Sequence, residues 1–486
     1  MTFRSFSDLA QSWAAIPCTL LAFFVSFCIY QIYFHPLAHI KGPLIPKLTP
    51  LWLYYHSYVG DESSVIDRLH KRYGPVLRIA PNEVDISDGA ALGPIYSEKG
   101  GFRKTLCYRN FDIDGHQTLF STLDAAHRAV RAKAVISMFS TANVRKDGGA
   151  IIESCVDKLV ARLKQAAQTK KRVNLLHLGR ALATDTVTGY LFGKSFETLN
   201  EEVDDSISVG AFVDTFVAVG RFFYWPAWWF QILEMFSEKM ASKKEKQEIG
   251  HSMSGVDQFV ENVVTAASKG ERTYQARLLD AGITKDETMA QCKDLIFAGT
   301  DSSGMNMATA CYYLAKFPDR YARLRAEVLE NPTALPETLP YLSAVVKEAL
   351  RISMANPTRL PRLVPDSGWV FNSSSGQAYH LPKNTQVGCA MYSLHHNEAV
   401  YPQPYEFIPE RWLDATPEMQ RDSFPFGLGA RQCIARNLAN AELFAGIKAV
   451  VRDDALKGAR PASGEIEIIE WFNSRVRGEK IELVWE

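Results

Sequence analysis

The chain has 486 residues, and its 54 lysines and arginines balance its 54 aspartates and glutamates. This balance provides no positive surface for nucleic acid, and 47% hydrophobic with 22% charged residues excludes a disordered, collagen-like or polytopic membrane protein. The eight cysteines form no CxxC pair and no zinc-ligand spacing, which argues against a disulfide framework or a zinc site. No Gly-, Ser- or Pro-rich stretch is long enough to be a linker, so we expect one large domain.

An apolar run over residues 13–34 predicts a transmembrane anchor. The run contains no Asp, Glu, Lys or Arg, and its 22 residues would span about 33 Å as a helix, enough to cross the hydrocarbon core of a bilayer. A secretory signal is the alternative, but its apolar part is usually about 7–15 residues long and ends at a small-residue cleavage site, which is missing here. His35, Lys41 and Lys47 follow the run, so the positive-inside rule places the main body in the cytosol.

Around the anchor, the sequence divides into three further parts. Residues 1–12 form a short N-terminal segment. Prolines at positions 36, 43 and 46 predict a stiff, extended stem over residues 35–50. Residues 51–486 are expected to form a single catalytic domain.

That domain is predicted to be mostly helical. Short strand patterns at residues 75–79 and 83–86 flank a Pro-Asn turn. Helical periodicity dominates from residue 124 to residue 351. Helices are expected at 126–139, 149–166 and 286–316. Irregular segments and short strands follow, so the pattern indicates a mainly α fold with small β-sheets at its edges, an α+β class.

The segment over residues 424–435, FPFGLGARQCIA, is the most informative in the sequence. It places a cysteine in a Gly-rich loop that runs directly into a helical pattern. Gly427 and Gly429 allow the backbone to approach a flat ligand, and backbone amides at a helix start stabilise a thiolate. Without the surrounding pattern, a lone cysteine is more often a buried structural residue.

The same segment resembles the heme-binding loop of the cytochrome P-450 family. The matching residues are Phe426, Gly429, Arg431 and Cys433, and Ala435 stands where the family usually has Gly. The resemblance implies the cytochrome P-450 fold, with heme b between the long central helix and the cysteine loop. It also implies that Cys433 is the ligand of the heme iron. Two longer phrases, YGPVLRIAPNEV and YSLHHNEAVYPQPYEFIPERW, resemble fungal members in particular.

Within the long predicted helix, residues 298–303 read AGTDSS and resemble the oxygen-activation motif of this family. Gly299 leaves room for dioxygen and water, and an acid beside a hydroxyl can relay protons. The resemblance therefore implies Ala298 and Gly299 as heme-contacting residues and Asp301 and Ser302 as catalytic residues. Ser302 replaces the usual Thr, which retains the hydroxyl and loses the β-methyl. A polar patch on an amphipathic helix is the alternative.

Two further segments carry the family's structural motif. Glu348 and Arg351 stand at i and i+3, on one helix face. The segment PERW at 409–412 resembles the companion motif, which implies that Glu348, Arg351 and Arg411 lock the fold around the heme loop. His395 and His396 are interpreted as structural, because adjacent residues rarely coordinate one metal.

Heme propionates are anionic and favour arginine forks. The resemblance offers Arg431 in the cysteine loop and Arg362 after the Glu-x-x-Arg helix. The stretch HRAVRAK adds His127 and Arg131, which resemble the family's Trp-x-x-x-Arg pattern with His in place of Trp. We therefore expect these four residues to bind the propionates.

The resemblance implies a heme-thiolate monooxygenase anchored in the endoplasmic reticulum membrane with its catalytic domain in the cytosol. No flavin or iron–sulfur domain fits in the remaining length, so electrons have to come from NADPH-cytochrome P-450 reductase, with cytochrome b5 as a further donor. A basic docking face is expected, and a plain solvated surface is equally compatible with each of its residues. These residues are Arg128, Lys133, Arg436 and Lys448.

Residues 222–232, FFYWPAWWFQI, are unusually aromatic and correspond to the family's access region. Such a patch either meets the membrane interface or packs in the core. We expect a bulky lipophilic substrate of fungal secondary metabolism, a terpenoid, polyketide or alkaloid. A heme-thiolate isomerase or dehydratase, which needs no external electrons, is the alternative, and the presence of Asp301 and Ser302 argues against it. A non-catalytic heme-binding protein would need no proton relay at all.

Overall fold

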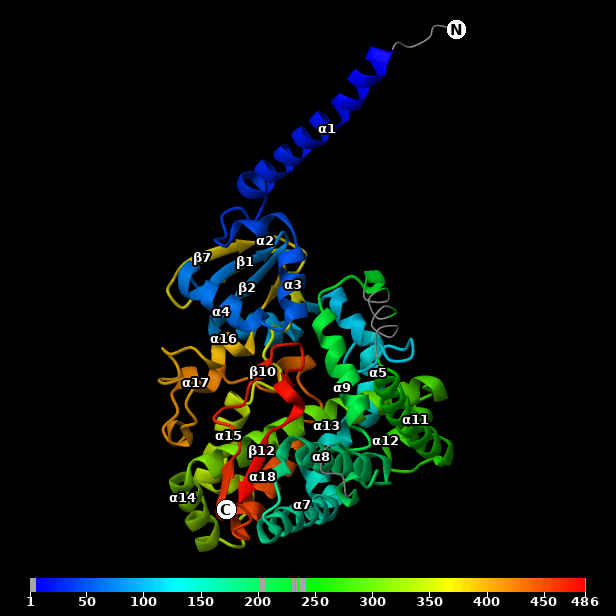
Figure 1. The fold of residues 1–486 in the computed structure, drawn as a ribbon, viewed down its shortest axis with the longest axis vertical. Coiled ribbons are helices and arrows are strands. Elements are labelled where there is room, and N and C mark those ends of the chain that lie inside the picture. Colours follow the sequence, from blue (N-terminus) through cyan, green and yellow to red (C-terminus); the bar gives the residue numbers. More distant parts are fainter. Residues whose placement is uncertain (1–5, 202–205, 230–231, 233–234, 236–241, 486) are drawn as a thin grey trace.

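The computed structural model describes residues 6–485, except 202–205, 230–231, 233–234 and 236–241. Helix α1 (Phe6–Ile29) projects from the body and continues into a π-helical turn, Tyr30–Phe34 (Figure 1). In the described part of the chain, one helical span, Ile16–Phe34, is long and apolar enough to cross a membrane, and only 6% of it is buried. Its apolar side chains are therefore not covered by this chain, which is compatible with the predicted anchor.

Residues 35–50 differ from the extended stem that their prolines predict. The side chains of Leu37 and Ile40 are fully buried in a cluster with the first strands of the body. The short helix α2 (Leu44–Leu48) follows, and Pro43 stands at its N-cap. The segment packs on the body because two of its side chains are large and apolar, and burial of that surface outweighs the preference of proline for an extended chain.

Arg78 joins this segment and the end of the apolar span to the body. Its side chain is fully buried and donates to the backbone oxygen and the side-chain Oε1 of Gln31, both at 2.9 Å. Its backbone N–H donates to the carbonyl of Lys41 at 2.8 Å. One buried arginine thus holds the chain on both sides of the turn at residue 35.

The main sheet brings distant parts of the sequence together. β1 (Val76–Ala80) and β2 (Glu83–Ile86) pair antiparallel across the predicted Pro-Asn turn. The sheet has the order β1-β2-β8-β5-β3, and β8 lies parallel to β2. Its other strands are β8 (Gln386–Gly388), β5 (Arg362–Leu363) and β3 (Arg103–Lys104). At the far end of the sheet, Lys104 lies directly opposite Arg362.

Three smaller sheets lie elsewhere in the described part of the chain. The three-stranded sheet has the order β4-β12-β9, and the other two are hairpins. The strands are β4 (Val173–Asn174), β12 (Glu482–Trp485), β9 (Ala459–Pro461), β6 (Trp369–Asn372), β7 (Ala378–Leu381), β10 (Ile468–Ile469) and β11 (Arg475–Val476).

Helices form most of the body, as the periodicity predicts. The three helices expected from the sequence are α5 (Ala125–Val135), which ends in a 3-10 turn, α7 (Gly149–Thr169) and α13 (Lys285–Lys316). The others are α3 (Leu51–Val59), α4 (Glu62–Tyr73), α6 (Thr141–Asn143), α8 (Leu175–Phe192), α9 (Gly210–Val219), α11 (Lys243–Ala266), α12 (Tyr274–Asp280), α14 (Pro318–Glu330), α15 (Pro340–Ile352), α16 (Met391–His395), α17 (Pro417–Asp422) and α18 (Arg436–Arg452).

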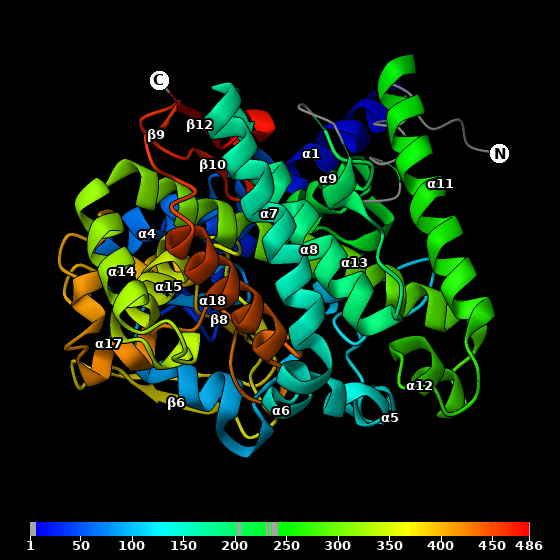
Figure 2. The same cartoon turned by 90° about the horizontal axis from the view of Figure 1, so that it is seen from below.

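Helix α13 crosses the centre of the body. Thr284 caps its start by accepting a hydrogen bond from the backbone N–H of Glu287. It packs closely against α8 and also contacts α18, and the three helices are seen from below in Figure 2. A Cβ on Gly179 of α8 would lie 2.5 Å from the backbone oxygen of Gly304, so α8 and α13 approach more closely than side chains would allow. This contact fixes the central helix relative to its neighbour.

Candidate active site

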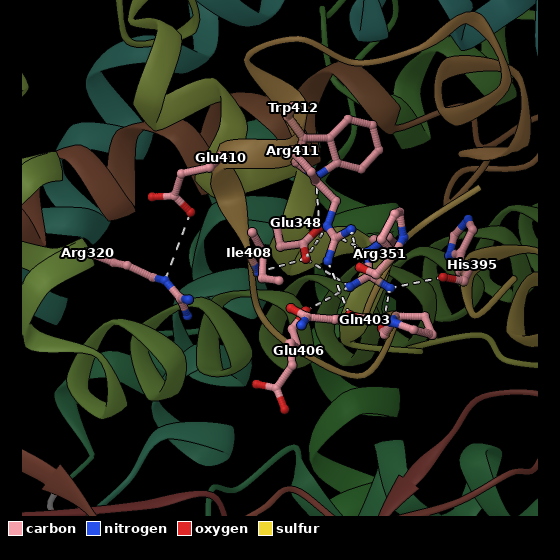
Figure 3. Close-up of polar contacts among 12 residues, drawn as sticks. Arg320, Glu348, Arg351, His395, Gln403, Glu406, Ile408, Glu410, Arg411 and Trp412 are labelled. Carbon is pink, nitrogen blue, oxygen red and sulfur yellow. Dashed lines mark hydrogen bonds and ion pairs between the residues drawn. The ribbon is translucent and has the colours of Figure 1, made fainter. Parts of the chain in front are cut away.

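A closed network of charged side chains forms around Glu348 (Figure 3). The carboxylate of Glu348 accepts two hydrogen bonds from Arg351, at 2.8 and 2.9 Å, and one from Arg411 at 3.1 Å. Trp412 Nε1 and the backbone N–H of Ile408 also donate to it, at 2.8 and 2.9 Å. Glu348 and Arg351 are fully buried, and both carboxylate oxygens are saturated with donors. The predicted lock between the two motifs is therefore formed.

Arg351 uses its remaining N–H groups on backbone oxygens. It donates to the carbonyl of His395 at 2.9 Å, to that of Pro404 at 2.7 Å and to that of Glu406 at 3.1 Å. A single guanidinium thus connects helix α15 with the irregular segment that precedes the cysteine loop. Because every charge in this network has its partner within the chain, the network needs no ligand.

The cysteine loop is held by two backbone hydrogen bonds and by glycine geometry. The N–H of Gly427 donates to the oxygen of Phe424 at 2.9 Å, and the N–H of Cys433 donates to that of Phe426 at 2.8 Å. Gly429 has φ +67°, and a Cβ on it would lie 2.0 Å from the backbone oxygen of Tyr96. Glycine is thus required here by the left-handed backbone and by the approach of residue 96, which is a different reason from the flat ligand that we expected.

Cys433 borders a cavity whose lining is mostly apolar. Its thiol is accessible from that cavity, just before the start of α18. Burial raises the pKa of the Cys433 thiol, while hydrogen bonds from the backbone N–H groups of Ala435 and Arg436 and the charge of Arg436 lower it. The start of the helix therefore provides the donors that stabilise a thiolate.

Helix α13 also lines this cavity, through Ala298, Gly299 and Ser302. The Ser302 hydroxyl donates to the backbone oxygen of Ala298 at 3.1 Å, one turn earlier. A Cβ on Gly299 would lie 2.7 Å from a methyl of Val187, so Gly299 also serves the packing of α13 against α8. Three of the four α13 residues expected at the site thus face the cavity.

Asp301, the fourth, lies behind this lining. It is 3% exposed and does not line the cavity. Its Oδ1 accepts from Arg180 at 2.7 Å, and its Oδ2 accepts from Asn473 at 3.3 Å. Burial raises the pKa of Asp301, and the charge of Arg180 opposes this rise. Arg180 also pairs with Asp214 at 2.9 Å. Because Asn473 does line the cavity, the carboxyl group is connected to it through that amide.

Four cationic side chains also line the cavity. They belong to Lys104, Arg128, Arg362 and Arg431. None of them forms an ion pair with a carboxylate among the residues that the structure describes. Their hydrogen bonds go to uncharged oxygens: the carbonyl of Phe120 (2.5 Å, from Lys104), the hydroxyl of Tyr108 (2.7 Å, from Arg362) and the carbonyl of Thr122 (3.1 Å, from Arg431). We call these four residues the open cation cluster.

The charges of this cluster act on one another. The pKa of Lys104 is well below its usual range because of burial and the charges of Arg362, Arg431 and Arg128. Burial, with the charges of Arg128 and Arg362, lowers the pKa of Arg431 to about 10. Asp294 borders the cavity as well, and burial raises its pKa to about 6 although Lys104 opposes the rise. Four neighbouring cations, of which Lys104 and Arg362 are buried and none is ion-paired with a described carboxylate, indicate a site for an anionic ligand.

His127 and Arg131 lie elsewhere, contrary to the expectation that they bind propionates. Arg131 forms two hydrogen bonds to the carboxylate of Glu287 on α13, one of them at 2.7 Å. His127 Nε2 is 3.7 Å from the same carboxylate, and neither residue lines the cavity. Arg128, which the sequence placed on a docking face, lines the cavity instead. Both side chains lie against Glu287 of α13 in this structure.

The cavity is therefore lined by a thiol, by small residues of a helix and by four cations. A flat, anionic group that takes a thiolate ligand, as heme does, fits this set of donors. Residues 43–456 match the family model described as cytochrome P-450. The chain belongs to the cytochrome P-450 family.

Individual relatives agree with this assignment. The chain is 36% identical to the cytochrome P-450 monooxygenase mfmF of Annulohypoxylon moriforme, over 97% of this chain and the full length of that protein. It is 29% identical to a fusicoccadiene C-8 hydroxylase of Alternaria brassicicola, over 87% of this chain and 85% of that one. It is 28% identical to a pisatin demethylase of Fusarium vanettenii, over 90% and 87%.

A crystal structure of another cytochrome P-450 superposes on this chain with a TM-score of 0.68. It covers 87% of this chain and 97% of its own, at 18% sequence identity, so it supports the fold alone. Together, the comparisons confirm the predicted family, fold class and enzyme class. The chain is a cytochrome P-450 monooxygenase, an oxidoreductase of a heme-binding family.

Several residues of this cytochrome P-450 site carry no motif in the sequence. Lys104 and Arg128 complete the open cation cluster, and Asn473 and Arg180 hold Asp301. They lie on β3, α5, the segment before β11 and α8. Lys104 could have been predicted as a site residue from its pairing with Arg362 across β3 and β5, but that pairing follows only from the sheet.

Proposed function

We propose that this chain is a heme b monooxygenase with Cys433 as the iron ligand. It would insert one oxygen atom into a bulky lipophilic small molecule of fungal secondary metabolism. The observation that carries the proposal is the cavity that is lined by Cys433, by the stretch from Ala298 to Ser302 and by the open cation cluster. Heme with a thiolate ligand supplies the activation of dioxygen, using electrons delivered one at a time.

The chain's own residues have three tasks in this proposal. Burial raises the pKa of the Cys433 thiol, and the backbone donors at the start of α18 offset part of that rise, so they would help to stabilise a thiolate on the iron. Arg362 and Arg431, expected from the sequence, bind the propionates together with Lys104 and Arg128. In this assignment His127 and Arg131 act indirectly, by fixing α5 to α13 through Glu287.

Proton supply is assigned to Asp301 and Ser302. Ser302 faces the cavity and holds its hydroxyl on the carbonyl of Ala298. Asp301 is a buried acid whose pKa is raised by burial, and its Oδ2 is linked to the cavity by Asn473. A proton held at that carboxyl group can pass to the Ser302 hydroxyl through ordered water.

A lipophilic substrate is supported by the distal part of the cavity. Its lining there is largely apolar and aromatic, and includes Phe111, Leu119, Phe120, Leu295, Phe297 and Phe472. Such a surface orients an apolar molecule and excludes water from the reaction. Two relatives are named for the hydroxylation of fusicoccadiene and for the demethylation of pisatin, which supports secondary metabolism as the setting.

We further propose that the protein is a single-pass protein of the endoplasmic reticulum membrane with residues 51–486 as its cytosolic catalytic domain. In this proposal residues 1–12 precede the anchor at 13–34, and residues 35–50 join it to the body. Exposed apolar side chains on α2 and α3, among them Leu44, Ile45, Leu51 and Tyr55, support contact with a bilayer surface.

One part of the aromatic run at residues 222–232 packs in the core, and another part is free to meet the membrane. Phe222, Phe223 and Tyr224 are buried, whereas Trp228 and Trp229 are exposed. Residues 230 and 231 lie outside the described residues. Trp225 stacks on Tyr54 of α3, with ring centroids 5.4 Å apart, and Trp229 contacts Trp225 in turn. The exposed tryptophans therefore extend the apolar surface next to α3. We propose that this surface admits substrate from the membrane.

Electrons are proposed to come from NADPH-cytochrome P-450 reductase, with cytochrome b5 as a further donor. Of the basic residues expected on the docking face, Lys133 and Arg436 are exposed. Lys448 donates to the carbonyl of Ala334 at 2.7 Å, and Arg128 belongs to the open cation cluster. The proposed docking surface therefore rests on Lys133 and Arg436.

The test compares metabolites by mass spectrometry in a host that supplies a reductase, with and without this chain. We expect the host without the chain to accumulate a precursor that is lighter than the missing product by one oxygen. A precursor and product of equal mass would instead establish the isomerase.

The Asp301→Asn, Ser302→Ala double variant and the Cys433→Ala variant are expressed in parallel. We expect the double variant to lose most of the product and the Cys433→Ala variant to lose all of it. Full turnover by the double variant would contradict the proton route but not the role of Cys433.

A further inference from the structure

His395 lies where the closed network and the cysteine loop meet. Its backbone oxygen accepts a hydrogen bond from Arg351 at 2.9 Å, as Figure 3 shows. Its ring Nε2 accepts a hydrogen bond from the backbone N–H of Phe424 at 3.3 Å. The residue is 1% exposed and borders the cavity that contains Cys433. One residue thus contacts the network through its backbone and the loop through its side chain.

The chemistry of the ring suits this contact. Nε2 can accept a hydrogen bond only when it carries no proton, which requires the neutral ring with its proton on Nδ1. Burial and the charge of Arg351 lower the pKa of His395 to about 3, so the ring stays neutral at physiological pH. The ring also packs edge-on against Phe424, with centroids 5.7 Å apart.

Phe424 is the first residue of the loop, and its position determines that of the thiol. Its backbone oxygen accepts the N–H of Gly427, and two residues further the oxygen of Phe426 accepts the N–H of Cys433. A displacement of Phe424 is therefore passed to Cys433 through the turn at residues 424–427 and through the hydrogen bond that closes the loop between Phe426 and Cys433. Among the described residues, no other side chain accepts a hydrogen bond from the backbone N–H of Phe424.

We propose that His395 is a positioning residue for Cys433, which transmits the fixed geometry of the Glu348–Arg351 network to the loop. The inference rests on the proposed role of Cys433 as the iron ligand. It assigns a specific task to a histidine that the sequence indicates only as structural.

The central experiment replaces His395 by Leu in the full-length, heme-loaded protein. Leu removes the acceptor and leaves the backbone N–H of Phe424 buried and unpaired. We expect about tenfold faster transfer of heme to apomyoglobin. We also expect a larger share of the ferrous–carbon monoxide band that indicates a protonated or displaced thiol. Wild-type heme transfer together with a wild-type band would overturn the proposal.

His395→Gln and His395→Asn test the acceptor itself and remain informative if the Leu variant does not fold. The Gln oxygen reaches the position of Nε2, and the shorter Asn oxygen does not. We expect Gln to restore the thiolate band and slow heme transfer, and Asn to restore them less. Equal behaviour of Gln and Asn would contradict a role for the acceptor at Nε2.

His396 provides the matched control. It is also buried, burial likewise lowers its pKa to about 3, and its ring stacks on Tyr405 at 4.6 Å rather than on the loop. We expect His396→Leu to keep the thiolate band even if it lowers stability. Loss of the band to the same extent as in His395→Leu would show a general packing effect and overturn the proposal.

Cys433→Ser separates this inference from the proposed function. We expect it to abolish the thiolate band completely. Persistence of the band in Cys433→Ser would contradict the proposed ligand. A band that is lost in Cys433→Ser and unchanged in His395→Leu would contradict only the positioning role.

Discussion

Two groups of cationic side chains, the pair at Glu348 and the open cation cluster, differ in one respect, which is whether a carboxylate of this chain neutralises them. Arg351 and Arg411 meet the carboxylate of Glu348, which is saturated by five donated hydrogen bonds. The open cation cluster meets only carbonyl and hydroxyl oxygens, and its charges depress one another's pKa values. The first group is complete within the chain, whereas the second is complete only with a ligand.

The difference separates a structural role from a binding role without reference to any motif. A buried charge that finds its counterion in the same chain contributes to the fold. A set of buried like charges without a counterion destabilises the empty protein and is stabilised when an anion arrives.

The largest effect is expected for Glu348→Gln. The amide cannot neutralise Arg351 and Arg411, so two buried cations lose their counterion at a cost of about 3–5 kcal/mol. Denaturant unfolding of the heme-free and heme-loaded protein should show this loss in both forms. Glu410→Gln is the control, because Glu410 pairs with Arg323 near the surface, where we expect less than about 1 kcal/mol. Equal losses in the two variants would contradict the distinction.

For Arg431→Gln we expect opposite results in the two forms of the protein. Heme binding should weaken by about 1.5–3 kcal/mol, because one charged donor to a propionate is lost. The heme-free protein should unfold at the same or higher denaturant concentration, because repulsion from Arg128 and Arg362 is relieved. Heme titration and unfolding of the heme-free form measure the two effects. If the heme-free form loses as much stability as heme binding does, Arg431 belongs to the fold rather than to the site.

Glu442 on α18 provides the reverse case, a buried acid that forms no ion pair with a cation among the residues that the structure describes. It is 1% exposed, and burial raises its pKa to about 8. Between its ordinary pKa of 4.5 and about 8, the folded protein holds a proton that the unfolded chain releases, so stability falls as pH rises through this window.

Glu442→Gln should remove this dependence, at most about 1.4 kcal/mol per pH unit. Unfolding at a series of pH values above 5 measures the slope. Glu153→Gln on α7 changes an exposed acid and should leave the slope as it is. An unchanged slope in Glu442→Gln would contradict the assignment of a buried, protonated carboxyl group.

The smallest effect distinguishes neighbouring arginines on α5. Arg128→Gln should reduce heme affinity by about 1 kcal/mol or somewhat more, because Arg128 lines the cavity. Arg131→Gln should instead lower the unfolding midpoint, since its partner is Glu287. Heme titration and unfolding of both variants check this division. Weaker heme binding in the Arg131 variant alone would favour the family pattern over the observed geometry.

The sequence predicts those parts of the site that spacing determines. The i, i+3 spacing of Glu348 and Arg351 puts them on one helix face, and the cysteine loop leads into α18 as expected. The limits of α7 and α13 also follow from periodicity, because their apolar faces repeat over many turns.

What spacing alone leaves open is the direction of a side chain within a turn. Asp301 and Ser302 are adjacent, but successive helical residues point about 100° apart, and only Ser302 reaches the cavity. The same rotation separates Arg128 from its neighbour His127. Arg180 holds Asp301 away from the cavity, and Glu287 does the same for His127. Both partners are distant in the sequence, so no local pattern could identify them.

The hydrogen bonds of Arg78 to Gln31 and Lys41 let the proposed anchor fix the orientation of the catalytic body. A flexible tether would let the catalytic body tumble above the bilayer, whereas a buried guanidinium bound to the last turns of the apolar span transmits the orientation of that span. The rotation of the body about the axis of the span then depends on the number of residues in the span. Each residue added or removed turns the body by about 100°. The proposed anchor would therefore set the orientation of the body as well as attach it to the membrane.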